Sequence, residues 1–303
     1  LLWLKQNATD VDVLHLFHLS LDTLFYGAYY KRLTPQGKLY LKLDVYNDHL
    51  KERKRYARSG LKNFLIKKVE MRFFRGLNLA TAENREGVEL VKETYPEIAS
   101  KTAYLPNGCH DQYLGNKFDS EKEKIILSVG RPGSPDKNYE LLLEALPKVN
   151  LADWKVVVVG PISEEFQQKL KAFFNKNPGL KEKVEFSGAE YDREALYHQF
   201  ARASVFVLPS RFESFGIALI EALYFGSCLV GHRGMYAYAD ICREGDFGTF
   251  FKSEDAESLA RAIENAMVKC LAPDFSKVAA EYCRKKFVWS MLSEELFAKL
   301  DHD

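Results

Sequence analysis

Short apolar runs alternate with amphipathic helical patterns along almost the whole chain of 303 residues. In the second half, strands are expected at residues 125–130, 155–160, 183–188, 204–208, 228–231 and 248–251. Helical patterns lie between them, at 139–149, 164–175, 193–203, 217–225 and 256–270. This alternation predicts an α/β fold in which right-handed crossover helices wrap a parallel sheet. Ligands bind such sheets at the carboxyl ends of the strands.

The first half repeats the alternation with fewer elements. Strands are expected at 11–16, 38–43, 77–81 and 102–104, and helices at 23–32, 50–74 and 85–94. Two amphipathic helices, 275–286 and 288–300, end the chain. Asn107-Gly108 and the polar stretch 115–124 provide the best linker between the halves. We therefore expect an N-terminal domain over 1–114, a C-terminal domain over 115–285 and a final helix over 286–303.

Two glutamates, Glu213 and Glu221, flank the start of the helix that follows the expected strand 204–208. Glu213 falls in the strand-to-helix turn and Glu221 lies inside the helix. At ~1.5 Å per residue their carboxylates are on the order of 10 Å apart along the axis, which suits the two ends of one extended ligand. The helix N-terminus between them favours a diphosphate. The pattern indicates a sugar, a diphosphate and a ribose in a row; glutamates that merely cap and solvate a helix are the alternative.

Arg131 and Lys137 lie in a loop rich in Gly, Pro and Ser, residues 129–138, between an expected strand and an expected helix. A loop of this kind can cradle an anion. Arginine grips phosphate oxygens with a bidentate fork, and lysine supplies a compact point charge. Such loops are common, so this one predicts a phosphate site only in combination with the Glu213 turn.

These two elements, together with Leu105-Pro106-Asn107-Gly108, resemble the retaining glycosyltransferases of family 4, the glycosyl transferases group 1. The resemblance spans most of residues 100–300. It implies a GT-B fold, in which two Rossmann-like domains with parallel sheets face a cleft and the last helix returns to the N-terminal domain. The N-terminal domain looks incomplete beside that family, so we expect early strands to be missing; a naturally smaller domain is the alternative.

The resemblance also implies roles for individual residues. In that family the loop Arg and Lys bind the donor's diphosphate, which implies this role for Arg131 and Lys137. Glu213 would contact the donor sugar and Glu221 the nucleotide ribose. The expected catalytic residues are Arg131, Lys137 and Glu213. The expected donor-binding residues are Gly130, Ser187, Gly188, Ser214, Phe215, Gly216, Ile217 and Glu221.

The implied reaction is transfer of a sugar from a nucleotide-diphosphate donor to a hydroxyl, with the anomeric configuration retained, in polysaccharide or glycolipid synthesis. The loop cations and the helix N-terminus would stabilise the leaving diphosphate, so we expect neither a metal nor a cofactor. Two other functions stay open. One is a hydrolase or epimerase of nucleotide sugars with the same fold, and the other is a non-catalytic nucleotide-sugar-binding subunit.

Three residues of the first half are candidates for the acceptor side. His15 and His18 follow the apolar run 11–14 of the first expected strand, where many members of the family carry a histidine. Asp44 follows the next strand, where another histidine is common in that family. A histidine beside an apolar strand more often has a structural role, which is the alternative for both. The expected acceptor is a saccharide or a lipid-linked saccharide.

Residues 51–75 carry ten basic and two acidic side chains, a net charge of +8, although the whole chain has a formal charge of only +1. Apolar residues are interspersed, so an amphipathic helix on an anionic membrane surface is one interpretation. An ordinary solvated helix is the other. Nucleic-acid binding is not expected, because no known binding motif accompanies the charge.

The chain has five cysteines without a C-x-x-C pair, and no apolar run reaches the ~18 residues of a membrane span. This pattern suits a reducing compartment better than a disulfide scaffold. We therefore expect a cytoplasmic protein that is at most peripheral at the inner face of the membrane.

Overall fold

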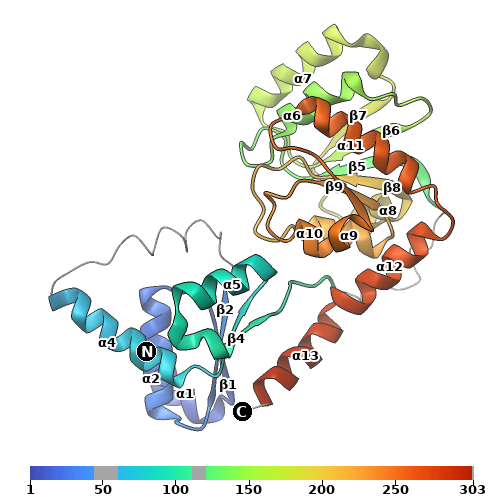
Figure 1. Ribbon diagram of the computed structural model, residues 1–303. Helices are drawn as coiled ribbons and strands as arrows, with labels where there is room; N and C mark the ends of the chain where they lie inside the picture. Colours follow the sequence, from blue (N-terminus) through green and yellow to red (C-terminus); the bar gives the residue numbers. More distant parts are fainter. Residues whose placement is uncertain (44–60, 111–120, 302–303) are drawn as a thin grey trace. The chain divides into compact units, whose positions relative to one another are not determined.

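The computed structural model describes residues 1–43, 61–110 and 121–301 (Figure 1). The chain divides into two compact units, one made of Leu1–Pro106 with Leu292–Asp303 and the other of Asn107–Met291. The domain boundary expected at 114/115 lies outside the described residues and stays a prediction. Residues next to it pair within the second unit, where Cys109 N donates to Phe287 O at 2.8 Å.

The first unit holds a parallel sheet, whose order within the described residues is β1-β2-β3-β4. Its strands are β1 (Val13–Phe17), β2 (Lys38–Leu43), β3 (Leu79–Ala82) and β4 (Thr102–Tyr104). Its helices are α1 (Leu2–Asn7), α2 (Leu21–Leu33), α4 (Leu61–Gly76) and α5 (Arg85–Thr94), with most of α13 (Trp289–Asp301). Ser20 and Asn84 cap α2 and α5 through their side-chain oxygens. Lys38 donates to Leu300 O at 2.8 Å and so ties α13 to β2.

The second unit holds a larger parallel sheet, with the order β10-β9-β8-β5-β6-β7 in the described part of the chain. Its strands are β5 (Glu123–Val129), β6 (Lys155–Val159), β7 (Val184–Gly188), β8 (Ala203–Val207), β9 (Cys228–Gly231) and β10 (Gly248–Phe250). Its helices are α6 (Tyr139–Ala145), α7 (Glu164–Lys176), α8 (Arg193–Arg202), α9 (Ile217–Tyr224), α10 (Tyr238–Ile241), α11 (Ala256–Lys269) and α12 (Phe275–Lys286). Short 3-10 turns lie at Ala8–Asp10, Pro96–Lys101, Leu146–Lys148, Pro178–Leu180 and Arg243–Gly245.

Alternate side chains of the central strands enter two different cores, because successive residues of a strand point to opposite faces. Ile125 and Leu127 of β5 pack with α8, α9, α10 and α12 on one face. Ile126, between them, packs with α6, α7 and α11 on the other (Figure 1). A sheet buried on both faces explains the nearly continuous apolar strand sequences.

The predicted strands and helices are present in the predicted order, and their ends agree or shift by a residue or two. Two differences have physical causes. The helix expected over 139–149 ends at Ala145 and continues as a 3-10 turn, where Pro147 has no N–H to extend the helix. α4 begins at Leu61, and the rest of the helix expected over 50–74 lies outside the described residues.

The described part of the basic segment 51–75 belongs to α4. Phe73 and Phe74 are buried in the core of the first unit. Lys67, Lys68, Met71, Arg72 and Arg75 line a surface hollow of about 670 Å³. The helix is therefore amphipathic as expected, while its contact with a membrane stays a prediction. None of the helices in the described ranges is both long and apolar enough to cross a bilayer.

Candidate functional site

The Arg131 loop and the Glu213 turn lie side by side, because β5 and β8 are neighbours in the sheet. Both segments follow the carboxyl end of their strand, where open parallel sheets bind ligands. The backbone joins them directly, since Arg211 N donates to Asp136 O at 2.8 Å. The elements that the sequence singled out therefore form one surface.

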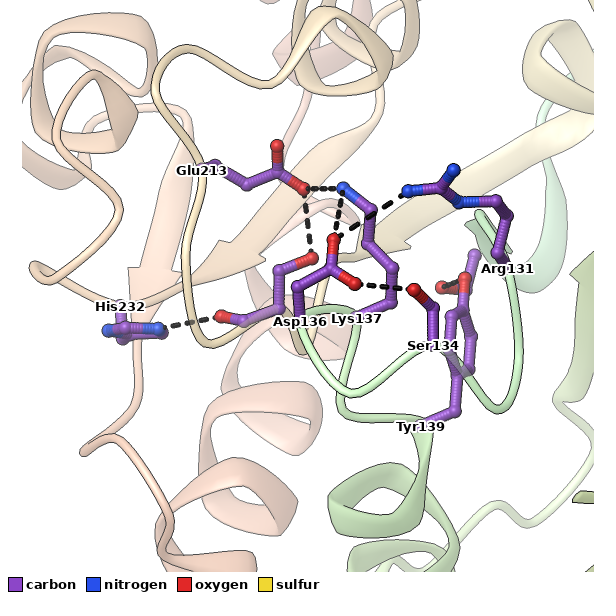
Figure 2. Close-up of polar contacts among 9 residues, drawn as sticks. Arg131, Ser134, Asp136, Lys137, Tyr139, Glu213 and His232 are labelled. Carbon is purple, nitrogen blue, oxygen red and sulfur yellow. Dashed lines mark hydrogen bonds and ion pairs between the residues drawn. The ribbon is translucent and has the colours of Figure 1, made fainter. Parts of the chain in front are cut away.

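Lys137 and Glu213 form an ion pair at the centre of this surface (Figure 2). The Lys137 Nζ to Glu213 Oε1 distance is 2.6 Å, and only 19% and 14% of the two side chains are exposed. Ser210 Oγ donates to the same carboxylate oxygen at 2.9 Å. Partial removal from water strengthens such a charge-assisted contact and fixes its geometry. The sequence analysis assigned Lys137 to the diphosphate and Glu213 to the sugar, as separate contacts. In the structure the two side chains contact each other.

Arg131 is more loosely held. Its side chain is 63% exposed, and its Nη2 lies 3.7 Å from Asp136 Oδ2. Burial acts to raise the pKa of Asp136, but hydrogen bonds from Ser134 and its own backbone, with the charges of Lys137 and Arg131, outweigh burial and keep this pKa below its ordinary value. Asp136 is therefore an ionised carboxylate beside both loop cations (Figure 2). The sequence analysis did not assign it a role.

Arg211 fastens the Glu213 turn to the loop, a role that the sequence analysis also missed. Its guanidinium donates to Pro135 O and pairs with Glu254, with 2.8 Å between Nε and Oε1. Asn138 Nδ2 donates to the same Glu254 oxygen at 3.2 Å. In the sequence, Arg211 is marked only by its position two residues before Glu213. Its contacts could not be predicted, because its partners come from two distant segments.

His232, which follows β9, is a second supporting residue. It is buried, and Gly234 N donates to its Nδ1 at 3.0 Å. The Nε2–H therefore donates to Ser210 O at 2.8 Å (Figure 2). Ser210 in turn bonds Glu213. Burial lowers the pKa of His232, against the hydrogen bond to Ser210 and the charge of Glu254. The neutral ring thus positions the turn that carries Glu213.

We expect His232 to make stability depend on pH. The unfolded chain takes up the proton near pH ~6.5 and the folded chain only at lower pH, so this contribution is complete above about 6.5 and is lost as the pH falls. Replacing His232 by Gln should remove it. The measurement is the difference in free energy of unfolding between the two proteins, by urea titration at about pH 7.5 and about pH 5.5. A difference that does not narrow at the lower pH would contradict the assignment.

Glu221 lies inside α9, as predicted, and is only 7% exposed. Burial raises the pKa of its carboxyl, and the charge of Arg193 opposes the rise. Arg193 Nη2 lies 3.4 Å from Glu221 Oε1. The helix begins after Gly216, which has φ +89°. Its N-terminus therefore lies between the two predicted glutamates.

The other predicted donor-binding residues differ in which of their backbone or side-chain groups are accessible to a ligand. Phe215 is buried against Phe287, so its backbone rather than its ring is available to a ligand. Ser214 is partly exposed, and Ile217 is half-exposed at the start of α9. An added Cβ on Gly130 would lie 2.6 Å from Tyr139 Oη. No side chain larger than hydrogen fits there without a shift.

Ser187 and Gly188 end β7. The Ser187 hydroxyl donates to Val158 O at 3.3 Å and is thus used within the sheet. Gly188 has φ +80°, and the space around its missing Cβ is open. Both residues lie at the carboxyl edge of the sheet that also carries the Arg131 loop. This position fits a role of their backbone in donor binding, which stays a prediction.

The acceptor-side candidates belong to the first unit. His15 lies inside β1, not after the strand. Its ring stacks on that of Tyr40, with 4.4 Å between the centroids, and lies tilted against that of Phe17, with 4.3 Å between the centroids. Desolvation by burial, followed by the charge of Lys42, lowers the pKa of His15. His18 follows β1 with φ +56°. Asp44 lies outside the described residues.

Among the residues that the structure describes, no three His, Cys, Asp or Glu side chains form a group that could hold a metal ion. All five cysteines are free. Burial raises the pKa of Cys242 to about 12 and that of Cys270 to about 11, so neither is a thiolate at neutral pH. The charged groups described at the site are the two loop cations with Asp136, the two glutamates with Arg193, and the Arg211–Glu254 pair.

Comparison with known sequences finds the family "Glycosyl transferases group 1" over residues 114–282. Glycogen synthase of Desulfitobacterium hafniense is 25% identical over 88% of this chain and 65% of its own length. Phosphatidyl-myo-inositol mannosyltransferase of Mycobacterium leprae is 28% identical over 66% of this chain and 53% of its own. The chain therefore spans less than two thirds of the length of these relatives.

Similar solved structures cover nearly the whole chain. HepE of Anabaena, in complex with UDP, has a TM-score of 0.72 and 17% identity over 99% of this chain and 81% of its own. The lipopolysaccharide outer core galactosyltransferase WaaB has a TM-score of 0.70 and 14% identity over 99% and 77%. Both are GT-B glycosyltransferases, so the likeness confirms the predicted fold class.

Proposed function

The chain belongs to the glycosyl transferases group 1 family, and on that premise we propose that it transfers a sugar from a nucleotide-diphosphate donor to a hydroxyl group, with retention of the anomeric configuration. The observation that carries this proposal is the Lys137–Glu213 pair, which places a cation for phosphate against a carboxylate for sugar hydroxyls. The solved HepE complexes with UDP and with UDP-glucose suggest the class of donor.

The donor's diphosphate would lie on the Arg131 loop and the N-terminus of α9. Arg131 is exposed and only loosely paired, so its guanidinium is available to bind two phosphate oxygens in a bidentate manner. Lys137 is already fixed in place by Glu213. As the bond between the anomeric carbon and the phosphate oxygen breaks, negative charge grows on that oxygen. Preorganised cations and helix N–H groups stabilise it at little reorganisation cost and without a metal.

Glu213 acts here as a binder of sugar hydroxyls. Its Oε1 accepts hydrogen bonds from Lys137 and Ser210, so we assign Oε2 to a donor hydroxyl. The acceptor hydroxyl attacks the anomeric carbon from the side that the diphosphate leaves. Its proton passes to the leaving phosphate oxygen, which balances the reaction and retains the configuration. No carboxylate attacks the sugar in this scheme.

The acceptor in this proposal is a saccharide, free or lipid-linked, in polysaccharide or glycolipid synthesis. The basic face of α4 around Lys67, Lys68, Arg72 and Arg75 favours the lipid-linked form at an anionic membrane surface on the cytoplasmic side. Sedimentation with vesicles that contain anionic lipid, compared with neutral vesicles, tests this. Equal recovery with both would remove the membrane from the proposal.

The function is tested with UDP-, GDP- and ADP-linked sugars. We expect one donor class to raise the unfolding temperature, because a ligand at 100 times its Kd stabilises by about 2.7 kcal/mol. That donor is then incubated with and without saccharide acceptors, and the products are analysed by chromatography and NMR. Glycosidic product with retained configuration supports the proposal. Free sugar without acceptor indicates a hydrolase, altered sugar on the nucleotide an epimerase, and binding without turnover a binding subunit.

A further inference from the structure

The first residue of α8, Arg193, is a cation where a helix disfavours one. The N-terminus of a helix carries a partial positive charge, so an arginine there needs another interaction to hold it. Arg193 has two. Its Nη2 lies 3.4 Å from Glu221 Oε1, and the same nitrogen donates to Tyr197 Oη at 3.0 Å. The guanidinium carbon also lies 5.2 Å from the centroid of the Tyr197 ring.

We propose that Arg193 is a positioning residue that keeps the Glu221 carboxylate ionised and oriented toward the ribose diol of a nucleoside-diphosphate donor. This inference rests on the proposed function. An ionised carboxylate accepts hydrogen bonds from both ribose hydroxyls, and charge-assisted bonds are about twice as strong as neutral ones. A buried carboxyl group without a cation tends to take up a proton instead. Arg193 acts through Glu221 and therefore sets how strongly the ribose is recognised.

An ordinary surface ion pair is the competing explanation, and exposed pairs contribute little. The Arg193–Glu221 pair is not of that kind, because the Arg193 side chain is 64% exposed while the Glu221 side chain is only 9% exposed. The buried partner bears the desolvation penalty, so the cation affects its ionisation more than the stability of the fold.

The helices α8, α10 and α12 and the strands β8 and β9 pack against α9, the helix that carries Glu221, and β9 begins with the buried Cys228. α8 presents Tyr197 together with Arg193. α12 packs against α9, but its Cys283 thiol donates to Ile220 O and its Arg284 lies over the Tyr224 ring. α10 also contacts α9 and carries Asp240. Of these groups, Arg193 is the cation whose contact with the carboxylate the described structure shows.

The test compares the full chain with Arg193→Gln, Arg193→Lys and the control Arg202→Gln. Arg202 is on the same helix and also pairs with a glutamate, Glu123, at 2.6 Å, yet it lies at the other end of α8. Calorimetric titration with UDP, GDP and ADP identifies the nucleotide that binds best. The same titration is then made with its 2′,3′-dideoxy analogue, which lacks the diol, while thermal unfolding confirms that each variant is folded.

We expect loss of the diol to weaken binding to the unaltered protein by about tenfold or more, the value of a hydrogen bond to a charged group. We call the loss of affinity caused by removing the diol the diol ratio. In Arg193→Gln the diol ratio should fall to a few-fold at about pH 7 and rise again as the pH is raised, because Glu221 then ionises without its partner. The affinity for the dideoxy analogue should stay unchanged. Arg193→Lys should retain most of the ratio, and Arg202→Gln all of it.

A double variant separates this role from a general effect on folding. In a Glu221→Gln protein, the further change Arg193→Gln should leave the diol ratio where it is, because the two residues act as one unit. Equal weakening of both ligands by Arg193→Gln, or an unchanged ratio and pH profile, would overturn this inference alone. Failure of all three nucleotides to bind the unaltered protein would overturn the proposed function and this inference with it.

Discussion

Lys137→Ala is expected to lower kcat for sugar transfer by about 100- to 1000-fold, the usual effect of removing one preorganised donor to a developing negative charge. The lysine contributes twice, since it would contact the diphosphate and it holds Glu213 at 2.6 Å. Without Lys137, the remaining hydrogen-bond donor to Glu213 Oε1 in the described structure is Ser210, so we also expect a loss of about 1–3 kcal/mol in the free energy of unfolding. Initial rates with the identified donor and urea unfolding measure the two effects.

Lys148→Ala is the matched control. Lys148 pairs with Glu257 at 2.7 Å, nearly the same geometry, but the side chains are 41% and 63% exposed. Removal of an exposed pair should cost less than ~1 kcal/mol and leave the rate unchanged. The double variant Lys137→Ala with Glu213→Ala removes both charges and should recover stability without recovering activity. Turnover within tenfold of the unaltered protein in the folded Lys137→Ala variant would refute the assignment of the site.

The fold was predictable because a sheet buried on both faces leaves a strong imprint on the sequence. Strands such as Lys155–Val159 are runs of valine, and the helices between them have clear amphipathic patterns. The short α10 was not predicted, since its four residues are too few to show a period. The prediction that His15 follows the strand was also wrong, because β1 continues to Phe17 and a strand has no cap residue to mark its end.

The candidate site was predictable in its parts but not in its contacts. Arg131, Lys137 and Glu213 were found from loop composition and from spacing along the chain. The contact between Lys137 and Glu213 joins residues on β5 and β8 loops, and it depends on those strands being neighbours in the sheet. Sequence order does not specify which non-consecutive strands lie together.

The supporting residues could not be predicted because their partners are mostly backbone carbonyls or residues of distant segments. His232 bonds Ser210 O, and Arg211 bonds Pro135 O. Any residue type supplies such a carbonyl, so no side-chain pattern marks the partner. Asp136 is different, because it is visible in the loop sequence. Its ionised state, however, depends on how Ser134, Lys137, Arg131 and its own backbone are arranged around the carboxylate in the folded structure.

Gly160→Ala is expected to be the most destabilising single substitution proposed for this chain, at about 4 kcal/mol or more. Gly160 has φ +145°, a backbone conformation that L-residues rarely adopt, and its added Cβ would lie 1.5 Å from Gly130 O. That oxygen is backbone of the neighbouring strand end and has no flexible side chain to move aside. The strands must separate, and residues 130–131 must move with them.

Two other glycines separate the causes of this effect. Gly188 has φ +80° but open space around its Cβ position, so Gly188→Ala should cost only the conformational strain of about 1–2 kcal/mol. Gly179 has open space and no such φ, so Gly179→Ala should be nearly neutral. Urea unfolding gives the three values. Since Gly130 directly precedes Arg131, Gly160→Ala should also weaken nucleotide binding at temperatures where the variant is still folded. A cost equal to that of Gly188→Ala, with binding unchanged, would mean that the close approach of the two strand ends does not shape the site.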